Sequence, residues 1–199
     1  MSFDQGGASY DPVVPLRQIH REGEFLSMYC GGGLSAQAAK KVGYQECRMT
    51  GVDNSSVMNH IWNKAHKQAT FHCMDASEYV EHQHRIKNFE MLQAGVPCDT
   101  SSSLNGFNST PFAIDTVLAV VSLLSGPNPP RHCEIECVNL FSKEHGYVGL
   151  LILSAAFKLN FFVRWYYINT ACFNDPQQRF RMYLHISRNP LTNMKPLCT

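Results

Sequence analysis

The sequence lacks an excess of charge of either sign, a long apolar run and an export signal. Its 199 residues include 17 Lys and Arg against 16 Asp and Glu, so the formal net charge is +1. This balance points to neither a nucleic-acid nor a membrane partner. The longest apolar run, Tyr147 to Phe157, is too short to cross a bilayer, and Lys158 interrupts its continuation. The N-terminus has no basic start and no apolar stretch, so we expect a soluble protein that is not secreted.

The short motifs of the common nucleotide sites are absent too. Neither Gly-x-x-x-x-Gly-Lys nor Gly-x-Gly-x-x-Gly occurs, and the run Gly31 to Gly33 is not enough for either. On this ground the sequence predicts no cofactor.

Ligand pairs spaced as in zinc sites are also missing. Structural zinc sites carry paired ligands two to four residues apart. Cys133 and Cys137, beside His132, share one face of an expected strand but lie about 13 Å apart at about 3.3 Å per residue. On an expected helix, His82 and His84 point about 200° apart. The sequence therefore predicts no metal site.

The composition is that of one reduced globular chain. Hydrophobic residues make up 44% and charged residues 17%, which is typical of a folded domain. Without export the eight cysteines stay reduced and behave as small buried hydrophobes. We predict an extended arm over residues 1–14 and a single globular domain over 15–199. The Gly- and Pro-rich segment 126–130 is a candidate hinge within it.

Helix signals gather in the N-terminal half. Pro15 can open a short helix that ends at Gly31, and Ser35 can cap a helical turn through Val42. Residues 48–70 are polar and aperiodic, so we expect them to be irregular. Residues 112–124 are almost wholly apolar and suit either a helix or a buried strand.

The clearest local signal is a helix over 75–94. Asp75 lies three residues before Glu78, which resembles a capping box. Gly95 and Pro97 follow, where a helix should end. Between them the side chains at helical spacing are Tyr79, His82, Ile86 and Phe89.

Strand signals dominate the C-terminal half. Residues 133–137 and 180–186 alternate apolar and polar side chains, as in strands buried on one face. Leu150 to Leu153 is apolar throughout, as in a strand covered on both faces, and Leu159 to Tyr167 is aromatic and β-branched. Asn174-Asp175-Pro176 should turn between the last two strands, which we expect to pair antiparallel. The predicted fold class is α+β, an antiparallel, jelly-roll-like sandwich with one or two helices in its N-terminal half.

The best candidate nucleophile is Cys30, because Gly31 to Gly33 could offer close backbone donors to an oxyanion. His20 and His145 are the candidate bases. No flanking signature supports this site, and a buried cysteine before a glycine turn is the preferred interpretation. We therefore predict no catalytic residue; whether the protein is an enzyme stays open, with a protein that is not an enzyme favoured.

A nucleic-acid surface is a further candidate. An aromatic run around Arg164 could stack bases, although such a run more often forms core on one face and interface on the other. The last 42 residues hold six basic side chains against the single acid Asp175, an excess that could face RNA. The aromatic residues are Phe161, Phe162, Trp165, Tyr166 and Tyr167.

Two segments are similar to segments of the capsid proteins of picorna-like viruses. Val13-Val14-Pro15-Leu16-Arg17-Gln18-Ile19-His20-Arg21 resembles their Leu-Arg segment, and residues 155–168 resemble an aromatic strand that carries an arginine, here Arg164. The resemblance implies a jelly roll, a place in the host cytoplasm or the virion, and association with itself, with other capsid subunits and with RNA.

The function predicted from the sequence is therefore a structural subunit of a larger assembly, a viral capsid protein. Two alternatives stay open: a Cys/His hydrolase or zinc-dependent enzyme, and a nucleic-acid-binding module.

Overall fold

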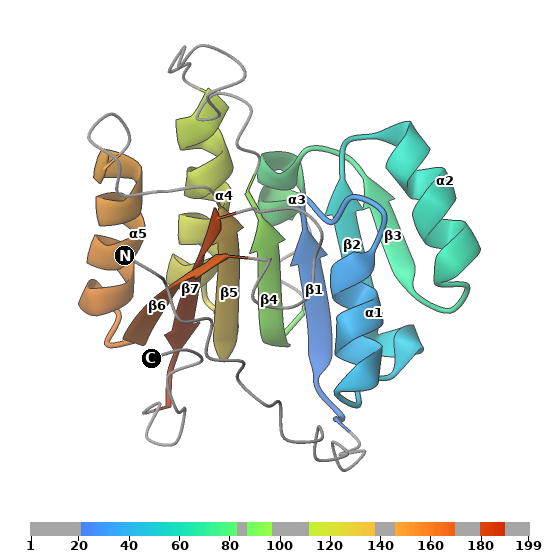
Figure 1. The fold of residues 1–199 in the computed structure, drawn as a ribbon, viewed down its shortest axis with the longest axis horizontal. Coiled ribbons are helices and arrows are strands. Elements are labelled where there is room, and N and C mark those ends of the chain that lie inside the picture. The colour runs from blue at the N-terminus through green and yellow to red at the C-terminus, as the bar shows by residue number, and fades with distance from the viewer. Residues whose placement is uncertain (1–20, 83–86, 97–111, 138–145, 170–179, 190–199) are drawn as a thin grey trace, which may run out of the picture.

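The computed structural model contains one seven-stranded sheet with helices on both faces (Figure 1). It describes residues 21–82, 87–96, 112–137, 146–169 and 180–189. The strand order is β3-β2-β1-β4-β5-β7-β6, and β7 alone runs antiparallel to its neighbours. The strands are β1 Glu24–Met28, β2 Met49–Asp53, β3 Thr70–Cys73, β4 Phe89–Gly95, β5 His132–Cys137, β6 Phe162–Asn169 and β7 Phe180–Ser187.

Helices connect the parallel strands, as parallel pairing requires. One face of the sheet carries α1 and α2 over β1 to β3, and the other carries α3, α4 and α5 (Figure 1). Described helices leave the first face open over β4, β5 and β7. The helices are α1 Leu34–Lys41, α2 Ser56–Ala65, α3 Ala76–His82, α4 Phe112–Ser125 and α5 Gly146–Lys158.

Two apolar clusters hold the layers together. The larger joins the sheet to α3, α4 and α5 and includes Leu92, Ile135 and Leu184, all fully buried. The smaller lies under α1 and α2 around Trp62, which is 0% exposed. Among the described residues, no helix is both long and apolar enough to cross a membrane.

The order of the strands fixes where a ligand can bind. From β1 the chain builds outward to β2 and β3, and then returns to place β4 on the other side of β1. Because the two connections leave in opposite directions, folds of this kind bind their ligands in a crevice between these two strands, at the carboxyl ends. This switch point is the first place to look for a site.

The predicted antiparallel jelly-roll sandwich is wrong, because four of the six strand pairings are parallel. What the sequence showed as a β-rich half contains two long helices, α4 and α5. Leu150 to Leu153 lies inside α5 rather than in a strand. This segment is apolar at every position, so its sequence carries no period that distinguishes helix from strand. The open question over 112–124 is resolved in favour of a helix, α4.

The helix predicted over 75–94 is only half correct. Asp75 does cap a helix: its Oδ1 accepts from the Ser77 backbone N–H at 2.8 Å, and α3 starts at Ala76. The helix ends at His82, however, and Phe89–Gly95 is strand β4. The irregular segment predicted over 48–70 is wrong as well, since it holds β2, α2 and the start of β3.

Other predictions agree with the structure. Strands form over 132–137 and 180–187, and β6 pairs antiparallel with β7. The helical turn from Ser35 is α1, although Gly33 is its N-cap.

The helix predicted from Pro15 to Gly31 is replaced by strand over Glu24–Met28, and its first residues lie outside the described part. The arm over 1–14 also lies outside it, and the hinge near 126–130 stays a prediction.

Candidate functional site

A glycine loop, which comprises residues 29–33, follows β1 at the switch point. The φ angles of Tyr29, Gly31 and Gly33 are 53°, 50° and 85°, a left-handed conformation that favours glycine. The loop closes with a hydrogen bond from the Gly33 N–H to the Cys30 carbonyl at 3.0 Å, and α1 begins at the next residue. A Cβ built on Gly31 would meet no atom within 4 Å. Backbone at Gly31 therefore faces open space at a helix N-terminus, where a ligand can approach closely.

Asp53 fixes this loop from the end of β2. Its Oδ2 accepts from the Gly31 N–H at 3.0 Å, and its Oδ1 accepts from the Ser55 N–H at 3.0 Å. Each carboxylate oxygen has a second lone pair, so the group can still accept hydrogen bonds from a ligand. In doubly wound folds an acid at this place binds ribose hydroxyls.

Glu136 lies near the end of β5, on the same edge of the sheet. Its Oε1 is 2.9 Å from Nε of Arg181 on β7, and the side chains are 32% and 13% exposed. Gly95, at the end of β4, lies between this pair and the glycine loop. A Cβ on Gly95 would be 3.4 Å from the Tyr29 carbonyl oxygen and 3.8 Å from Glu136 Oε2. The carboxylate and the loop therefore border the same edge of the crevice.

A groove of about 830 Å³ runs from Glu136 across the face of the sheet that the described helices leave uncovered. Its wall is apolar, with Leu34 and Ala38 of α1 and with Val42, which follows α1. On the sheet side, Phe25 of β1 and Met91 of β4 are apolar. The polar side chains of the floor come from three adjacent strands: Gln93 on β4, His132, Glu134 and Glu136 on β5, and Arg181, Tyr183 and His185 on β7.

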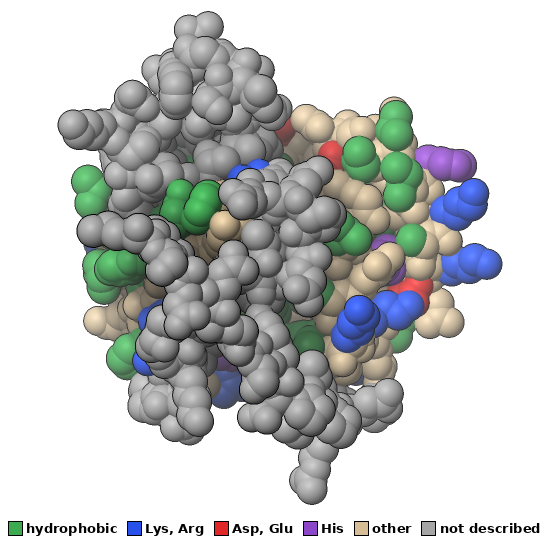
Figure 2. Space-filling view, viewed as in Figure 1, with side chains coloured by type: hydrophobic (Ala, Val, Ile, Leu, Met, Phe, Trp, Pro, Cys, Tyr) green, Lys and Arg blue, Asp and Glu red, His purple; other side chains and the backbone are tan. Residues whose placement is uncertain are grey.

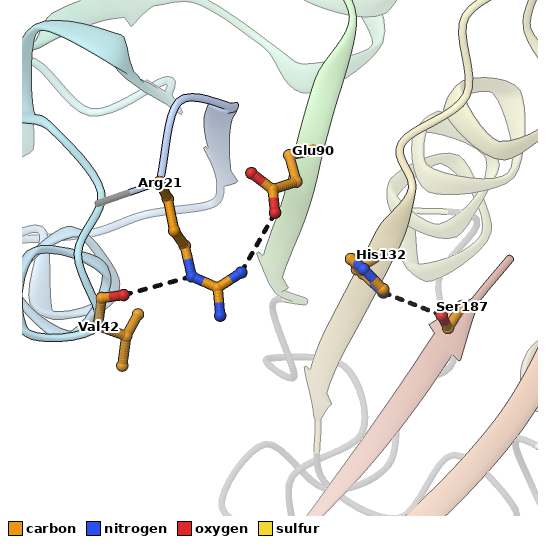
Figure 3. Close-up of polar contacts among 5 residues, drawn as sticks. All are labelled: Arg21, Val42, Glu90, His132 and Ser187. Carbon is orange, nitrogen blue, oxygen red and sulfur yellow. Dashed lines mark hydrogen bonds and ion pairs between the residues drawn. The ribbon is translucent and has the colours of Figure 1, made fainter. Parts of the chain in front are cut away.

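Polar contacts close the groove at the amino edge of the sheet (Figure 3). Arg21 lies 3.2 Å from Glu90 Oε1 and donates through Nε to the Val42 carbonyl at 3.3 Å. His132 Nδ1 is 2.9 Å from the Ser187 hydroxyl. Burial, and then the neighbouring His185, lower the pKa of His132 below its ordinary value.

Cys30 is not an activated thiol. It is 9% exposed, and burial, with the nearby Asp53 carboxylate, raises its pKa to about 12. The interpretation of Cys30 as a buried cysteine before a glycine turn is therefore confirmed. His20 and His145, its candidate bases, lie outside the described residues.

Those histidines and cysteines weighed as zinc ligands that the structure describes do not gather. Within the described ranges, no three His, Cys, Asp or Glu side chains could hold a metal ion. Cys133 and Cys137 are buried in the main core, and His82 ends α3, whereas His84 lies outside the described residues.

The described members of the aromatic and basic set do not form one surface either. Phe161 is 4% exposed, whereas Trp165 and Tyr167 are about 60% exposed, so the run is partly core. Arg181 is held in the groove, and the Arg188 guanidinium lies 5.5 Å from the Phe161 ring. Exposed basic side chains gather instead over α1 and α2, at the right of Figure 2. They include Lys40, Lys41 and Lys64.

Sequence reasoning missed Asp53 and Glu136. Both are acidic residues at or next to the carboxyl end of a short strand, Asp53 after Met49 to Val52 and Glu136 in the alternating strand 132–137. That position was the available signal, but it becomes informative only once the strands are known to be parallel.

Comparisons with known proteins agree with this geometry. A family model described as C-5 cytosine-specific DNA methylase matches residues 23–197. No curated protein sequence matches the chain.

Solved structures of methyltransferases share the fold. The Entamoeba histolytica methyltransferase EhMeth superposes with a TM-score of 0.70 at 18% identity, over 88% of this chain and 56% of that one. The S. pombe Dnmt2 methyltransferase gives a TM-score of 0.68 at 17% identity, over 84% of this chain and 50% of that one. Aeropyrum pernix fibrillarin, in complex with S-adenosyl-L-methionine, gives 0.57 at 10% identity, over 87% and 68%. The chain thus spans about half the length of the first two structures.

These findings overturn the resemblance to picorna-like capsid proteins. Residues 155–168, which carried it, belong to α5 and the edge strand β6 of a mostly parallel sheet. The predicted capsid subunit is wrong, and the two alternatives, a Cys/His or zinc hydrolase and a simple nucleic-acid-binding module, fit no better. Since the family model covers residues 23–197, the chain belongs to the C-5 cytosine-specific DNA methylase family.

Proposed function

We propose that this chain carries the cofactor site and the reaction centre of an enzyme that methylates carbon 5 of cytosine in DNA. S-adenosylmethionine, the molecule bound to the fibrillarin of the same fold, is the proposed methyl donor. The observation that carries the proposal is that the glycine loop and the Glu136–Arg181 pair border one crevice. A donor site and an acceptor site must adjoin for direct group transfer. This proposal replaces the prediction of no cofactor and the preference for a protein that is not an enzyme.

The residues of the first half of the crevice fit the cofactor. Open space over Gly31 admits a ligand against the backbone, and Asp53 keeps lone pairs for ribose hydroxyls. When bound, S-adenosylmethionine supplies an electrophilic methyl group on a sulfonium. The chain's contribution here is to hold and orient that group beside the end of β4.

Glu136 is the proposed contact to the base. A carboxylate reads cytosine by accepting from its exocyclic amino group. The ion pair with Arg181 at 2.9 Å fixes the direction of that carboxylate. A cytosine in a duplex has to leave the base stack to reach such a pocket.

Carbon 5 of cytosine is a weak nucleophile, so the reaction needs an activating group. A thiolate that adds to carbon 6 makes carbon 5 electron-rich enough to take the methyl group, and the electron pair of the broken C–S bond stays on the donor sulfur. Transfer of the carbon 5 proton to a base and departure of the thiolate from carbon 6 then restore the ring. The thiol we assign is Cys98, because it comes three residues after Gly95, the last residue of β4. Its position lies outside the described residues, and the assignment rests on this place in the chain.

Methyl transfer from labelled S-adenosylmethionine to DNA tests the proposal. The product, 5-methyldeoxycytidine, is measured by mass spectrometry after digestion of the DNA. We expect E136Q to lose roughly 100-fold in rate, as for removal of one transition-state hydrogen bond. The matched control is E134Q, two residues earlier on the same face of β5, which should stay within about threefold. C98S should abolish transfer, whereas C47S, at an exposed cysteine, should not.

An RNA arm separates the substrates. Transfer to DNA supports the proposal as stated, and transfer to RNA alone would contradict the DNA assignment. Absence of transfer to both, or an E136Q variant as active as the unmodified chain, would contradict the proposed reaction.

A further inference from the structure

A buried histidine at the end of α2 contacts the glycine loop. His66 follows α2 directly and is 1% exposed. Its Nε2 lies 3.1 Å from the carbonyl oxygen of Gly33, which is 33 residues earlier in the chain. A carbonyl oxygen only accepts hydrogen bonds, so Nε2 carries the proton and donates it.

This bond is not needed to satisfy the carbonyl. The Gly33 oxygen already accepts from the Gln37 N–H at 3.1 Å, the first hydrogen bond of α1. The second donor fixes the orientation of the carbonyl group, because its oxygen is then bonded both to α1 and to the residue that ends α2. The loop needs such support, because Tyr29, a residue with a side chain, has a φ of 53°. Backbone in this region is strained and persists only when its surroundings hold it.

Trp62 completes the support under the loop. Its ring lies 4.8 Å from the His66 ring, centroid to centroid, and is fully buried. A Cβ built on Gly33 would lie 2.6 Å from His66 Nε2 and 3.0 Å from Trp62 Cε3. A Cβ on Gly51 of β2 would lie 2.8 Å from Trp62 as well. Two glycines therefore admit one tryptophan and one histidine, which we name the aromatic platform.

The aromatic platform contacts one part of the glycine loop, and a ligand can approach another part. Gly33 rests against the platform, whereas a Cβ on Gly31, two residues earlier, would meet nothing within 4 Å. The side supported by protein and the side open to a ligand are thus both defined by the same short turn. A shift of the Gly33 carbonyl would tilt the Gly31 backbone that a ligand approaches.

We propose that His66 is a positioning residue for the cofactor: its Nε2–H fixes the Gly33 carbonyl and so presets the glycine loop for binding. The inference rests on the proposed function, which assigns the loop to S-adenosylmethionine. His66 touches neither the cofactor nor the reacting atoms. It lowers the cost of binding by keeping the loop in its bound shape before the ligand arrives.

The geometry specifies which replacement should rescue the role. Among the described residues, His66 Nδ1 is buried and has no hydrogen-bond partner, so Nε2 alone carries the contact. The amide nitrogen of glutamine can occupy the place of Nε2, whereas asparagine is too short to reach it. H66Q therefore keeps the donor, and H66N removes it with a similar loss of aromatic packing.

Calorimetric titration of the full chain with S-adenosylmethionine tests the proposal. We expect H66N to raise the Kd about tenfold, equivalent to about 1.4 kcal/mol, and H66Q to stay within about twofold of the unmodified chain. H60Q, at an exposed histidine within α2, is the control and should change nothing. At saturating cofactor, H66N should keep its kcat while its KM for the cofactor rises.

A second measurement needs no substitution. In the unmodified chain, the imidazole nitrogen signals of His66 should show an Nε2-protonated ring and should shift on addition of S-adenosylmethionine, while those of His60 stay in place. This measurement decides the question even where a His66 variant does not fold.

The outcomes separate this inference from the proposed function. Equal Kd values for H66N, H66Q and the unmodified chain, with only a lower melting temperature, would show a packing role and overturn the inference. So would a His66 ring whose signals ignore the cofactor. An unmodified chain that binds no S-adenosylmethionine would instead contradict the proposed function on which the inference rests.

Discussion

Glu136 and Arg181 come from strands that run in opposite directions and meet at 2.9 Å beside the glycine loop. β7 is the strand that reverses direction, so its first residues, and not its last, lie at the carboxyl edge of the sheet. The reversal therefore brings a guanidinium to a carboxylate at the place where a doubly wound sheet binds its ligands.

Arg181 should be needed for methyl transfer but not for cofactor binding. R181K keeps the charge but loses the planar donor geometry of Arg, so we expect a rate about tenfold lower, and R181M about 100-fold lower. The cofactor Kd should be unchanged in both. R188K, at the other end of β7, is the matched control. An R181M variant with an unaltered transfer rate would show that Glu136 needs no partner.

Cys30 should resist alkylation in the folded chain. Burial and the Asp53 carboxylate raise its pKa to about 12, so almost no thiolate is present at about pH 8. Iodoacetamide followed by peptide mass spectrometry should modify the exposed Cys47 and Cys73 and leave Cys30 intact until the chain is denatured. Rapid labelling of native Cys30 would contradict the buried glycine-loop geometry.

His132 should make the fold less stable in mild acid. Burial and His185 lower its pKa below the ordinary value, so the unfolded chain binds the proton more tightly than the folded one. The sign follows: the neutral-pH stability is lost as the pH falls through about 6.5 toward the lower folded pKa. Between about pH 7.5 and pH 5, the free energy of unfolding, measured with denaturant, should fall less for H132N than for the unmodified chain. An equal loss in both chains would exclude His132 as a cause.

Trp62 should dominate the stability of the α1 and α2 layer. It is fully buried against Gly33 and Gly51, so W62A leaves a large cavity and should cost about 3–5 kcal/mol of unfolding free energy. The second tryptophan, Trp165, is 59% exposed, and W165A should cost less than about 1.5 kcal/mol. Urea unfolding measures both. Similar losses in the two variants would argue against the packing described here.

Strands with one buried face could be predicted from the sequence. In β5 and β7 the polar and apolar side chains alternate, because one face lies on the core and the other faces the groove. The pairing of β6 with β7 followed from the turn signal Asn174-Asp175-Pro176 between two aromatic strands. These predictions used only local patterns.

The helices were harder to predict because their sequences hide the period. In α5 even exposed positions such as Leu150 and Leu151 are apolar, so no polar stripe marks the solvent side. In α2 the opposite holds: Trp62 is its single buried residue, and one large side chain makes no repeat. Tyr79 and Phe89 fell at helical spacing by chance, since one lies in α3 and the other in β4.

The site could not be predicted because it is made by topology. Gly31, Asp53 and Glu136 are separated by 22 and 83 residues in the sequence, and only the parallel order β2-β1-β4-β5 brings them to one edge. Each is unremarkable in its own segment.

The most direct test of the account is calorimetric titration of S-adenosylmethionine into the unmodified chain and into D53A. Asp53 holds the Gly31 N–H at 3.0 Å and is the proposed ribose ligand, so it acts on the cofactor site twice. We expect one site per unmodified chain, and a Kd at least about 30-fold higher in D53A, as for loss of about 2 kcal/mol from charged hydrogen bonds. No binding to the folded, unmodified chain, or equal affinity in D53A, would contradict the placement of the cofactor at the carboxyl edge of β1 and β2.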